Sequence, residues 1–169
     1  MISAGDKRIG LIALTILFWD QVTKLIVRRS FSGGEERVVI DGFFKFVLWR
    51  NTGAAWSFFH DHNGILAAVS LLALGLLFYF RRHFDIRSVA GQVAVGLILG
   101  GILGNLTDRL LIGYVVDFLR FYLYQRGGQE IGFPAFNIAD SAICIGVGLL
   151  LLRSAREQTT STPVAGSNA

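Results

Sequence analysis

Four long runs of apolar residues alternate with more polar stretches along this chain. The runs cover residues 9–27, 64–80, 89–106 and 133–152. The second and third runs contain no charged residue, the first is interrupted by Asp20 and Lys24, and the fourth carries only Asp140. A helix of about 20 apolar residues spans the hydrocarbon core of a bilayer. The pattern therefore predicts an all-α polytopic membrane protein with four transmembrane helices, which places both chain termini on the same side.

The connectors after the first and third runs are long enough to carry structure of their own. Residues 37–40 and 43–48 are apolar and aromatic stretches on either side of Asp41-Gly42, a strong hairpin signal, and predict a small extracytoplasmic β-ribbon. Residues 51–59 contain Trp56 among small and aromatic residues and predict a short interfacial helix. Residues 113–132, with Gly127-Gly128, suggest a mobile flap.

The whole of residues 1–158 fits a single transmembrane domain, followed by a small, polar and disordered tail at 159–169. The first run lacks a small-residue cleavage site before a polar region, so we interpret it as a retained helix. Hydrophobic residues make up 53% of the 169 residues. The net charge of +4 comes from Lys and Arg scattered over all the connectors, which argues against a nucleic-acid partner.

The distribution of Lys and Arg predicts the orientation. Residues 1–8, 81–88 and 153–169 hold seven in 33 residues, whereas 28–63 and 107–134 hold eight in 64. Cytoplasmic segments are enriched in Lys and Arg. We therefore expect both termini in the cytoplasm, with 28–63 and 107–134 outside.

The most informative polar residues are two aspartates at the outer ends of apolar segments, Asp117 and Asp140. A carboxylate at membrane depth costs about 2.5–3.5 kcal/mol on insertion scales, so such a residue indicates a functional site. Two of them suggest acid–base chemistry. No Ser/His pair and no Cys/His spacing typical of a metal site accompanies them, and Cys144 lies alone in an apolar run. We expect no metal and no cofactor.

Further polar residues lie one helical turn apart within the spans. Asp20 and Lys24 are placed to form an ion pair, and Asn105, Asp108 and Arg109 share one helix face. Each group also has a purely structural explanation: a neutralised pair, an interfacial salt bridge at a helix end, or, for Asp140 after Asn137, a helix cap. Glycines recur every four residues at 96, 100 and 104 and predict close helix packing.

With four spans, these polar residues converge near the outer boundary, which independent caps and ion pairs would not require. The convergent set is Lys24, Asn51, Asn105, Arg109, Asp117, Asn137 and Asp140. One alternative is a small proton-coupled transporter or channel subunit that uses the carboxylates as relay groups. It is less favoured because a pathway needs polar groups across the bilayer and the run 64–80 offers almost none. A structural subunit would leave the convergence unexplained.

Several motifs in the same order resemble the lipoprotein signal peptidases, or signal peptidase II, of bacterial membranes. They are Asp20-Gln-Val-Thr-Lys24, Asn51-Thr-Gly-Ala-Ala-Trp-Ser57, Gly100-Gly-Ile-Leu-Gly-Asn-Leu-Thr-Asp-Arg109, Val115-Val-Asp-Phe118 and Phe136-Asn-Ile-Ala-Asp-Ser141. The resemblance covers about residues 9–152. Trp56 stands where many members have Phe, a change between large aromatic residues.

The resemblance implies an intramembrane aspartyl endopeptidase that removes the signal peptide from prolipoproteins just before a diacylglyceryl-modified cysteine. Asp117 and Asp140 match the catalytic pair. The positions that match its polar support and substrate-binding surface are Asp20, Lys24, Asn51, Gly53, Asn105, Asp108, Arg109, Asn137 and Ala139. We accordingly expect a monomer in the bacterial cytoplasmic membrane, in contact with membrane lipid and with its active site at the outer face.

The resemblance also fits the chemistry of paired carboxylates, which cannot cheaply both ionise. The start of the fourth helix favours the charged form of Asp140, whereas the apolar neighbours Val116 and Phe118 favour neutral Asp117. Water is then the nucleophile.

Overall fold

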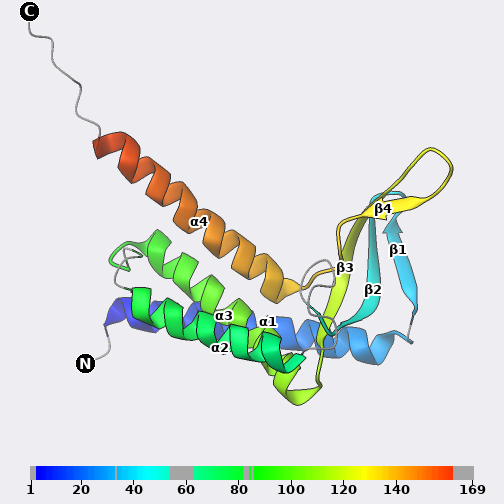
Figure 1. The fold of residues 1–169 in the computed structure, drawn as a ribbon, viewed down its shortest axis with the longest axis horizontal. Helices are drawn as coiled ribbons and strands as arrows, with labels where there is room; N and C mark the ends of the chain where they lie inside the picture. The colour runs from blue at the N-terminus through cyan, green and yellow to red at the C-terminus, as the bar shows by residue number, and fades with distance from the viewer. Residues whose placement is uncertain (1–2, 33, 54–62, 82–83, 85, 162–169) are drawn as a thin grey trace, which may run out of the picture.

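The computed structural model describes residues 3–32, 34–53, 63–81, 84 and 86–161. The elements are, in order, α1 Ala4–Ser30, β1 Glu36–Ile40, β2 Phe44–Asn51, α2 Asn63–Phe80, α3 Val89–Leu111, β3 Val115–Tyr124, β4 Glu130–Gly132 and α4 Ile138–Ser161 (Figure 1). Four helices are long and apolar enough to cross a membrane. The predicted helical membrane fold with a small sheet is therefore confirmed.

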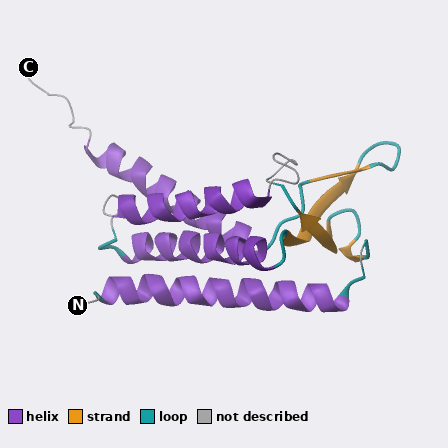
Figure 2. Ribbon diagram, turned by 60° about the horizontal axis from the view of Figure 1, so that its bottom comes forward, coloured by secondary structure: helices purple, strands orange, loops and turns teal. Residues whose placement is uncertain are grey.

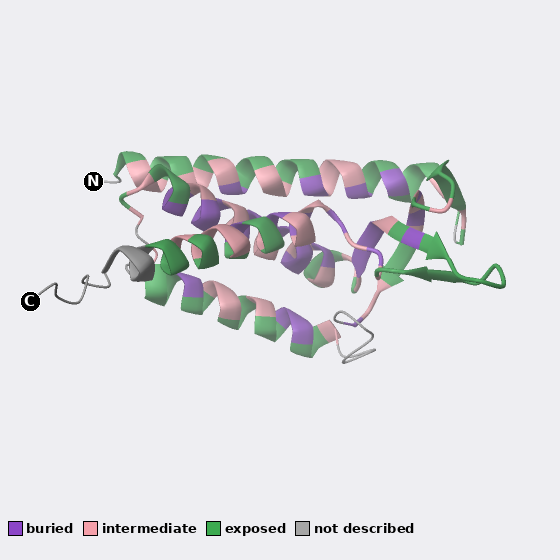
Figure 3. Ribbon diagram, turned by 90° about the horizontal axis from the view of Figure 1, so that it is seen from above, coloured by how far each residue is buried: buried purple, intermediate pink, exposed green. Residues whose placement is uncertain are grey.

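Helix α3 lies at the centre of the bundle and packs against α1, α2 and α4, and it carries most of the buried helical residues (Figure 3). Its glycines make this packing possible. A Cβ atom at Gly100 would lie 2.7 Å from the Ala13 carbonyl oxygen of α1, and one at Gly96 would lie 2.8 Å from the Ile12 side chain. The predicted glycine face is thus the surface on which α1 packs.

The sheet projects from one end of the bundle, opposite the end where α1 begins and α4 ends (Figures 1 and 2). Its four strands lie in the order β1-β2-β3-β4, and every pairing is antiparallel. The expected ribbon is confirmed as β1 and β2, joined by a turn in which Gly42 has a φ of 69°. A positive φ suits glycine because it has no Cβ.

Residues 113–132, which we expected to form a flap, instead provide two further strands. β3 pairs with β2 from Phe44↔Phe121 to Asn51↔Val115, and β4 pairs with the far end of β3. Gly127 and Gly128 both have positive φ in the turn between them. The sheet is therefore wider than the sequence predicted, and it fixes Asp117 on a paired strand.

The fourth helix begins at Ile138, five residues later than the apolar run that predicted it. Pro134 lacks an N–H group and favours an extended residue before it. The preceding segment instead runs along β3, with Phe133 donating to the Phe121 carbonyl and Phe136 to the Leu119 carbonyl. Asn137 consequently precedes α4 instead of lying within it.

Two other expectations concern the margins of the described region. Helix α4 continues to Ser161, past the point where we expected the tail to begin. The expected interfacial helix at 51–59 falls mostly on residues 54–62, outside the described residues. Its first residue, Asn51, ends strand β2.

Candidate active site

Asp117 lies on β3 with its side chain almost completely buried. Both of its carboxylate oxygens accept a hydrogen bond from an amide. Asn51 Nδ2 on the neighbouring strand donates to Oδ2 at 2.8 Å, and Asn137 Nδ2 donates to Oδ1 at 2.8 Å. Asn51 Oδ1 in turn accepts from the Gly53 backbone N–H at 3.0 Å, which turns the amide nitrogen of Asn51 toward the carboxylate. The Asp117 carboxyl is thus held from both sides.

Asp140 lies in the first turn of α4. The segment that leads into this helix pairs with β3 through Phe136, and the start of α4 lies near that strand (Figure 1). Its backbone N–H donates to Asn137 Oδ1 at 2.9 Å, and its Oδ2 accepts from the Asn137 backbone N–H at 3.3 Å. This reciprocal pair is a helix-capping arrangement. Asp140 Oδ1 faces away from the cap and accepts from Asn105 Nδ2 at 2.7 Å. The Asp140 carboxylate therefore caps α4 with one oxygen and binds the Asn105 amide with the other.

Two asparagine amides connect the aspartates. Asn137 Nδ2 donates to Asp117 Oδ1 and also to Asn105 Oδ1 at 3.1 Å, while Asn105 Nδ2 donates to Asp140. Lys24 Nζ donates to Asn105 Oδ1 at 3.0 Å. An ammonium group can only donate, so it requires the Asn105 oxygen on its side. Lys24 thereby directs the Asn105 amide nitrogen toward Asp140.

Lys24 is the centre of a buried ionic cluster, which we call the Lys24 cluster and define as Asp20, Lys24 and Asp108. Its Nζ lies 2.8 Å from Asp20 Oδ2 and 3.0 Å from Asp108 Oδ2. Together with Asn105, these oxygens match all three N–H groups of the ammonium. The predicted ion pair between Asp20 and Lys24 is confirmed. The partner of Asp108 is Lys24 on another helix, a pairing that the sequence did not predict.

The Lys24 cluster also holds the backbone next to each aspartate of the pair. Asp20 Oδ1 accepts from the Ala139 N–H at 2.9 Å, and Asp108 Oδ2 accepts from the Val116 N–H at 3.1 Å. Ala139 immediately precedes Asp140, and Val116 immediately precedes Asp117. One cluster on α1 and α3 therefore fixes the positions of both carboxyls, which come from two other elements.

Gln21 also belongs to this network, although its place in the sequence did not predict a role for it. Its Nε2 lies 3.0 Å from Asp108 Oδ1, 3.1 Å from the Gly104 carbonyl oxygen and 3.2 Å from Asp20 Oδ2. A Gln beside an Asp within an apolar helix is a signal that could have identified it. Its contacts tie the two carboxylates of the Lys24 cluster together.

Arg109 lies at the edge of the network, and its guanidinium is only partly paired. One terminal N–H group donates to the Asn105 carbonyl oxygen at 3.5 Å, whereas Nε is buried without a hydrogen-bond partner among the described residues. Asn63 on α2 donates to the Arg109 carbonyl oxygen at 2.9 Å. The guanidinium is thus a cation near both aspartates, and its Nε–H has no acceptor in the part of the chain that the structure describes.

The protonation of Asp117 follows from its surroundings. Burial raises the pKa of this carboxyl to about 7, and the neighbouring negative charge of Asp140 acts in the same direction. The amides of Asn51 and Asn137 and the charge of Lys24 oppose the rise. A pKa near neutrality allows a carboxyl group to hold a proton and also to release it, as acid–base catalysis requires.

The structure brings all eleven site residues predicted from the sequence together in one hydrogen-bond network, with Arg109 at its edge. Gly53 and Ala139 take part through their backbone N–H groups, and the remaining nine through their side chains. Among the described residues, no group of three His, Cys, Asp or Glu side chains could hold a metal ion. The arrangement is suited to proton transfer between a buried carboxyl, Asp117, and a half-buried one, Asp140.

Comparisons with known proteins agree with the motifs and with the fold. Residues 12–156 match the model of the family described as signal peptidase (SPase) II. A lipoprotein signal peptidase of Chromobacterium violaceum is 39% identical over 89% of this chain and 92% of its own length. The corresponding protein of Geobacter sulfurreducens is 40% identical over 90% and 94%.

Two solved structures of bacterial membrane enzymes obtained by the in meso method share the fold. The one at 2.3 Å resolution has a TM-score of 0.77 and 32% identity, and the match covers 93% of both chains. The one at 1.9 Å has a TM-score of 0.71 and 36% identity, and the match covers 85% of this chain and 90% of that one. The chain therefore belongs to the signal peptidase II family, the lipoprotein signal peptidases.

Proposed function

We propose that this protein is an intramembrane aspartyl endopeptidase that cleaves the signal peptide from diacylglyceryl-modified prolipoproteins just before the lipidated cysteine. Membership of the family supports a protease that processes lipoprotein signal peptides. The single observation that carries the aspartyl mechanism is the pair Asp117 and Asp140, joined by two shared asparagine amides at one end of a membrane bundle.

In the proposed mechanism, the two carboxyls share one proton. Neutral Asp117 donates its proton to the oxygen of the scissile carbonyl, and ionised Asp140 takes a proton from water, whose oxygen attacks the carbonyl carbon. When the tetrahedral intermediate collapses, Asp140 returns a proton to the leaving nitrogen, and the re-forming carbonyl returns its proton to Asp117. The pair thus ends the cycle in its starting state.

Arg109 is proposed to position the substrate. Its buried Nε has no hydrogen-bond partner among the described residues, and its charge lies close enough to both aspartates to interact with them. A guanidinium in this position can donate to a backbone carbonyl of an extended peptide. Such a contact would hold the chain across the pair in a reactive geometry.

The location of the pair suits a substrate that is itself anchored in the membrane. The aspartates lie where the bundle meets the sheet, a level at which a lipidated cysteine is retained by its acyl chains. Anchoring fixes the depth of the scissile bond and supplies proximity. We place the protein, as a monomer, in the bacterial cytoplasmic membrane with this site at the outer face.

The catalytic assignment is tested by Asp117→Asn and Asp140→Asn. Each variant should cleave a lipidated prolipoprotein several orders of magnitude more slowly while still inserting in the membrane, because an amide keeps the size of the carboxyl but cannot exchange a proton. Cleavage is measured with purified protein in detergent. Near-normal turnover by a folded variant removes that residue from the mechanism, and ion flux in proteoliposomes without cleavage would support the transporter alternative.

The substrate class is tested with one prepeptide in two forms, with and without the diacylglyceryl group. At equal concentration in the same bilayer, kcat/KM should be far higher for the lipidated form because its acyl chains align the scissile bond. Equal kcat/KM for the two forms would contradict lipid-dependent specificity and leave the aspartyl mechanism standing.

A further inference from the structure

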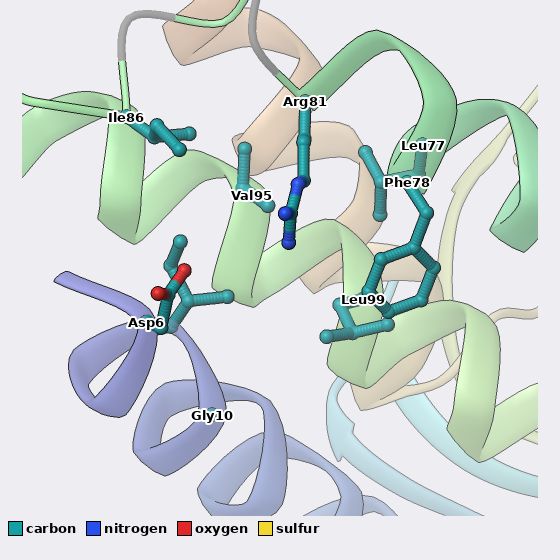
Figure 4. Close-up of a pocket in the computed structure, with 9 residues that line it drawn as sticks. Asp6, Gly10, Leu77, Phe78, Arg81, Ile86, Val95 and Leu99 are labelled. Carbon is teal, nitrogen blue, oxygen red and sulfur yellow. The ribbon is translucent and has the colours of Figure 1, made fainter. Parts of the chain in front are cut away.

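A cavity opens between α1, α2 and α3 at the end of the bundle opposite the aspartates (Figure 4). Its volume is about 380 Å³. The walls are apolar side chains of all three helices, among them Ile9, Leu77, Val95 and Leu99. A volume of this size lies within the range of cavities that hold small ligands, about 300–1,000 Å³.

Among the described residues, α1 and α2 each pack chiefly on α3 and make few contacts with each other, which leaves the cavity between them. Gly10 faces it from α1, and a Cβ atom at this position would meet no other atom within 4 Å. In a membrane, a gap with apolar walls is filled by hydrocarbon, since water has no hydrogen-bond partners there.

The rim of the cavity carries two opposite charges. In Figure 4 the Arg81 guanidinium points into the cavity and the Asp6 carboxylate lies across from it. No salt bridge between these two side chains is found among the described residues. Asp6 Oδ2 accepts from the backbone N–H and the hydroxyl of Ser3, whereas Oδ1 has no hydrogen bond among the described residues. The rim therefore offers a cation and an acceptor, separated from each other.

We propose that this cavity is a binding site for one phospholipid with an ethanolamine headgroup. The acyl chain fills the space between α1 and α2, Arg81 binds the phosphate, and Asp6 Oδ1 accepts a hydrogen bond from the primary ammonium. A choline headgroup has no N–H to donate, and a purely anionic headgroup would place a second negative charge beside Asp6. A transmembrane helix, at about 10 Å in diameter and about 30 Å in length, is too large for a volume of about 380 Å³.

The bound lipid would act as a packing element between α1 and α2. Its acyl chain would contact Leu77 and Leu99 on one side and Ile9 on the other, giving α2 a second attachment besides α3. A ligand that binds only the folded state raises the stability of that state. This inference concerns the end of the molecule remote from Asp117 and Asp140, and it does not depend on the catalytic assignment.

The test measures thermal unfolding of delipidated, purified protein in detergent with added dioleoyl phosphatidylethanolamine or dioleoyl phosphatidylcholine. We expect the ethanolamine lipid to raise the unfolding midpoint by roughly 3–6 °C at about ten times its dissociation constant. The choline lipid should raise it much less. Arg81→Gln should weaken the response to both lipids, because both carry the phosphate, whereas Asp6→Asn should lose most of the difference between them.

Two further variants test the apolar space and the charge at its rim separately. Gly10→Leu fills the cavity without a backbone clash and should abolish the response to lipid while the free protein stays folded. Lys7→Gln makes the same change in charge as Arg81→Gln, but Lys7 is on α1 and does not line the cavity, so this variant should respond as the wild type does. Equal stabilisation by both lipids, or a wild-type response in Gly10→Leu, would overturn the proposal.

Discussion

At the scale of single residues, the side chains of the network could be predicted from the sequence, but most of its connections could not. Asp20, Lys24 and Asp140 stand out because charged residues are rare in apolar runs. The hydrogen bonds from the Ala139 and Val116 backbone to the Lys24 cluster carry no such signal, since every residue except proline has an N–H group. The positioning of the aspartates is therefore visible only in three dimensions.

The raised pKa of Asp117 predicts how stability and activity depend on pH. In the folded state the pKa of this carboxyl is about 7, so Asp117 keeps its proton up to about pH 7. In the unfolded chain its pKa returns to the ordinary value of 3.8, so the proton is lost near pH 4. Stability contributed by neutral Asp117 is complete below about pH 4 and is lost as the pH rises to about 7. Asp117→Asn should lack this loss, so its unfolding midpoint relative to wild type should rise across that window.

The same titration should limit turnover, because the proposed mechanism needs a proton on Asp117. Wild-type kcat/KM, which reports ionisations of the free enzyme, should therefore fall above about pH 7. The predicted effect on stability is measured separately, by comparing the unfolding midpoints of wild type and Asp117→Asn in differential scanning calorimetry from pH 4 to 8. A constant difference in midpoint between wild type and Asp117→Asn over this range would show that Asp117 does not titrate there.

The Lys24 cluster leads to a second prediction. Lys24→Met keeps the approximate length of the side chain but leaves Asp20 and Asp108 buried without their cation, which costs about 3–5 kcal/mol. It also frees the Asn105 amide to rotate away from Asp140. Well below the unfolding temperature, kcat should fall about a hundred-fold through misplacement of the pair, with KM changed much less.

A control variant distinguishes this effect from lost stability. Lys45→Met also removes a buried cation, in this case from the sheet, where Lys45 bonds Glu36 at 2.5 Å and Glu130 at 2.7 Å. It should lower the unfolding midpoint with a much smaller effect on kcat. Equal losses of kcat in the two variants, at equal losses of stability, would argue against a positioning role for Lys24.

At the scale of elements, the helices were predictable because a bilayer imposes a length and a composition on each span. Strand β3 was not identified because its partner β2 lies far away in the sequence, with Asn51 opposite Val115. A run of aromatic and β-branched residues at 115–124 was a local hint. The true start of α4 depends on Pro134 and on pairing with β3, which hydrophobicity alone does not report.

The contact between α1 and α3 yields a prediction at this scale. Gly100→Ala would place a Cβ 2.7 Å from the Ala13 carbonyl oxygen, so one helix must move, at a cost of about 1–3 kcal/mol. Gly75→Ala on α2 is the matched control, since its Cβ would meet nothing within 4 Å. Thermal unfolding in detergent should be earlier for Gly100→Ala and unchanged or later for Gly75→Ala. Equal midpoints for the two variants would contradict the proposed contact.

At the scale of the whole molecule, the two ends of the bundle differ in structure and in charge. One end carries the sheet and the aspartate pair, and the other carries the start of α1 and the end of α4 (Figures 1 and 2). The apolar cavity also lies at this second end. Lys and Arg are denser in the segments at the second end. The positive-inside rule therefore predicts that the second end faces the cytoplasm.

This asymmetry predicts the topology of the protein in the membrane. In a background with Cys144 replaced by alanine, single cysteines at Ser32 and Gln129, both exposed at the sheet end, should react with an impermeant thiol reagent in intact spheroplasts. A cysteine at Arg87, exposed at the other end, should react only after lysis. The reverse pattern would place Asp117 and Asp140 on the cytoplasmic side. An acyl-anchored substrate whose cysteine lies at the outer surface could not then reach them, so this labelling also decides whether the proposed site and the proposed substrate can meet.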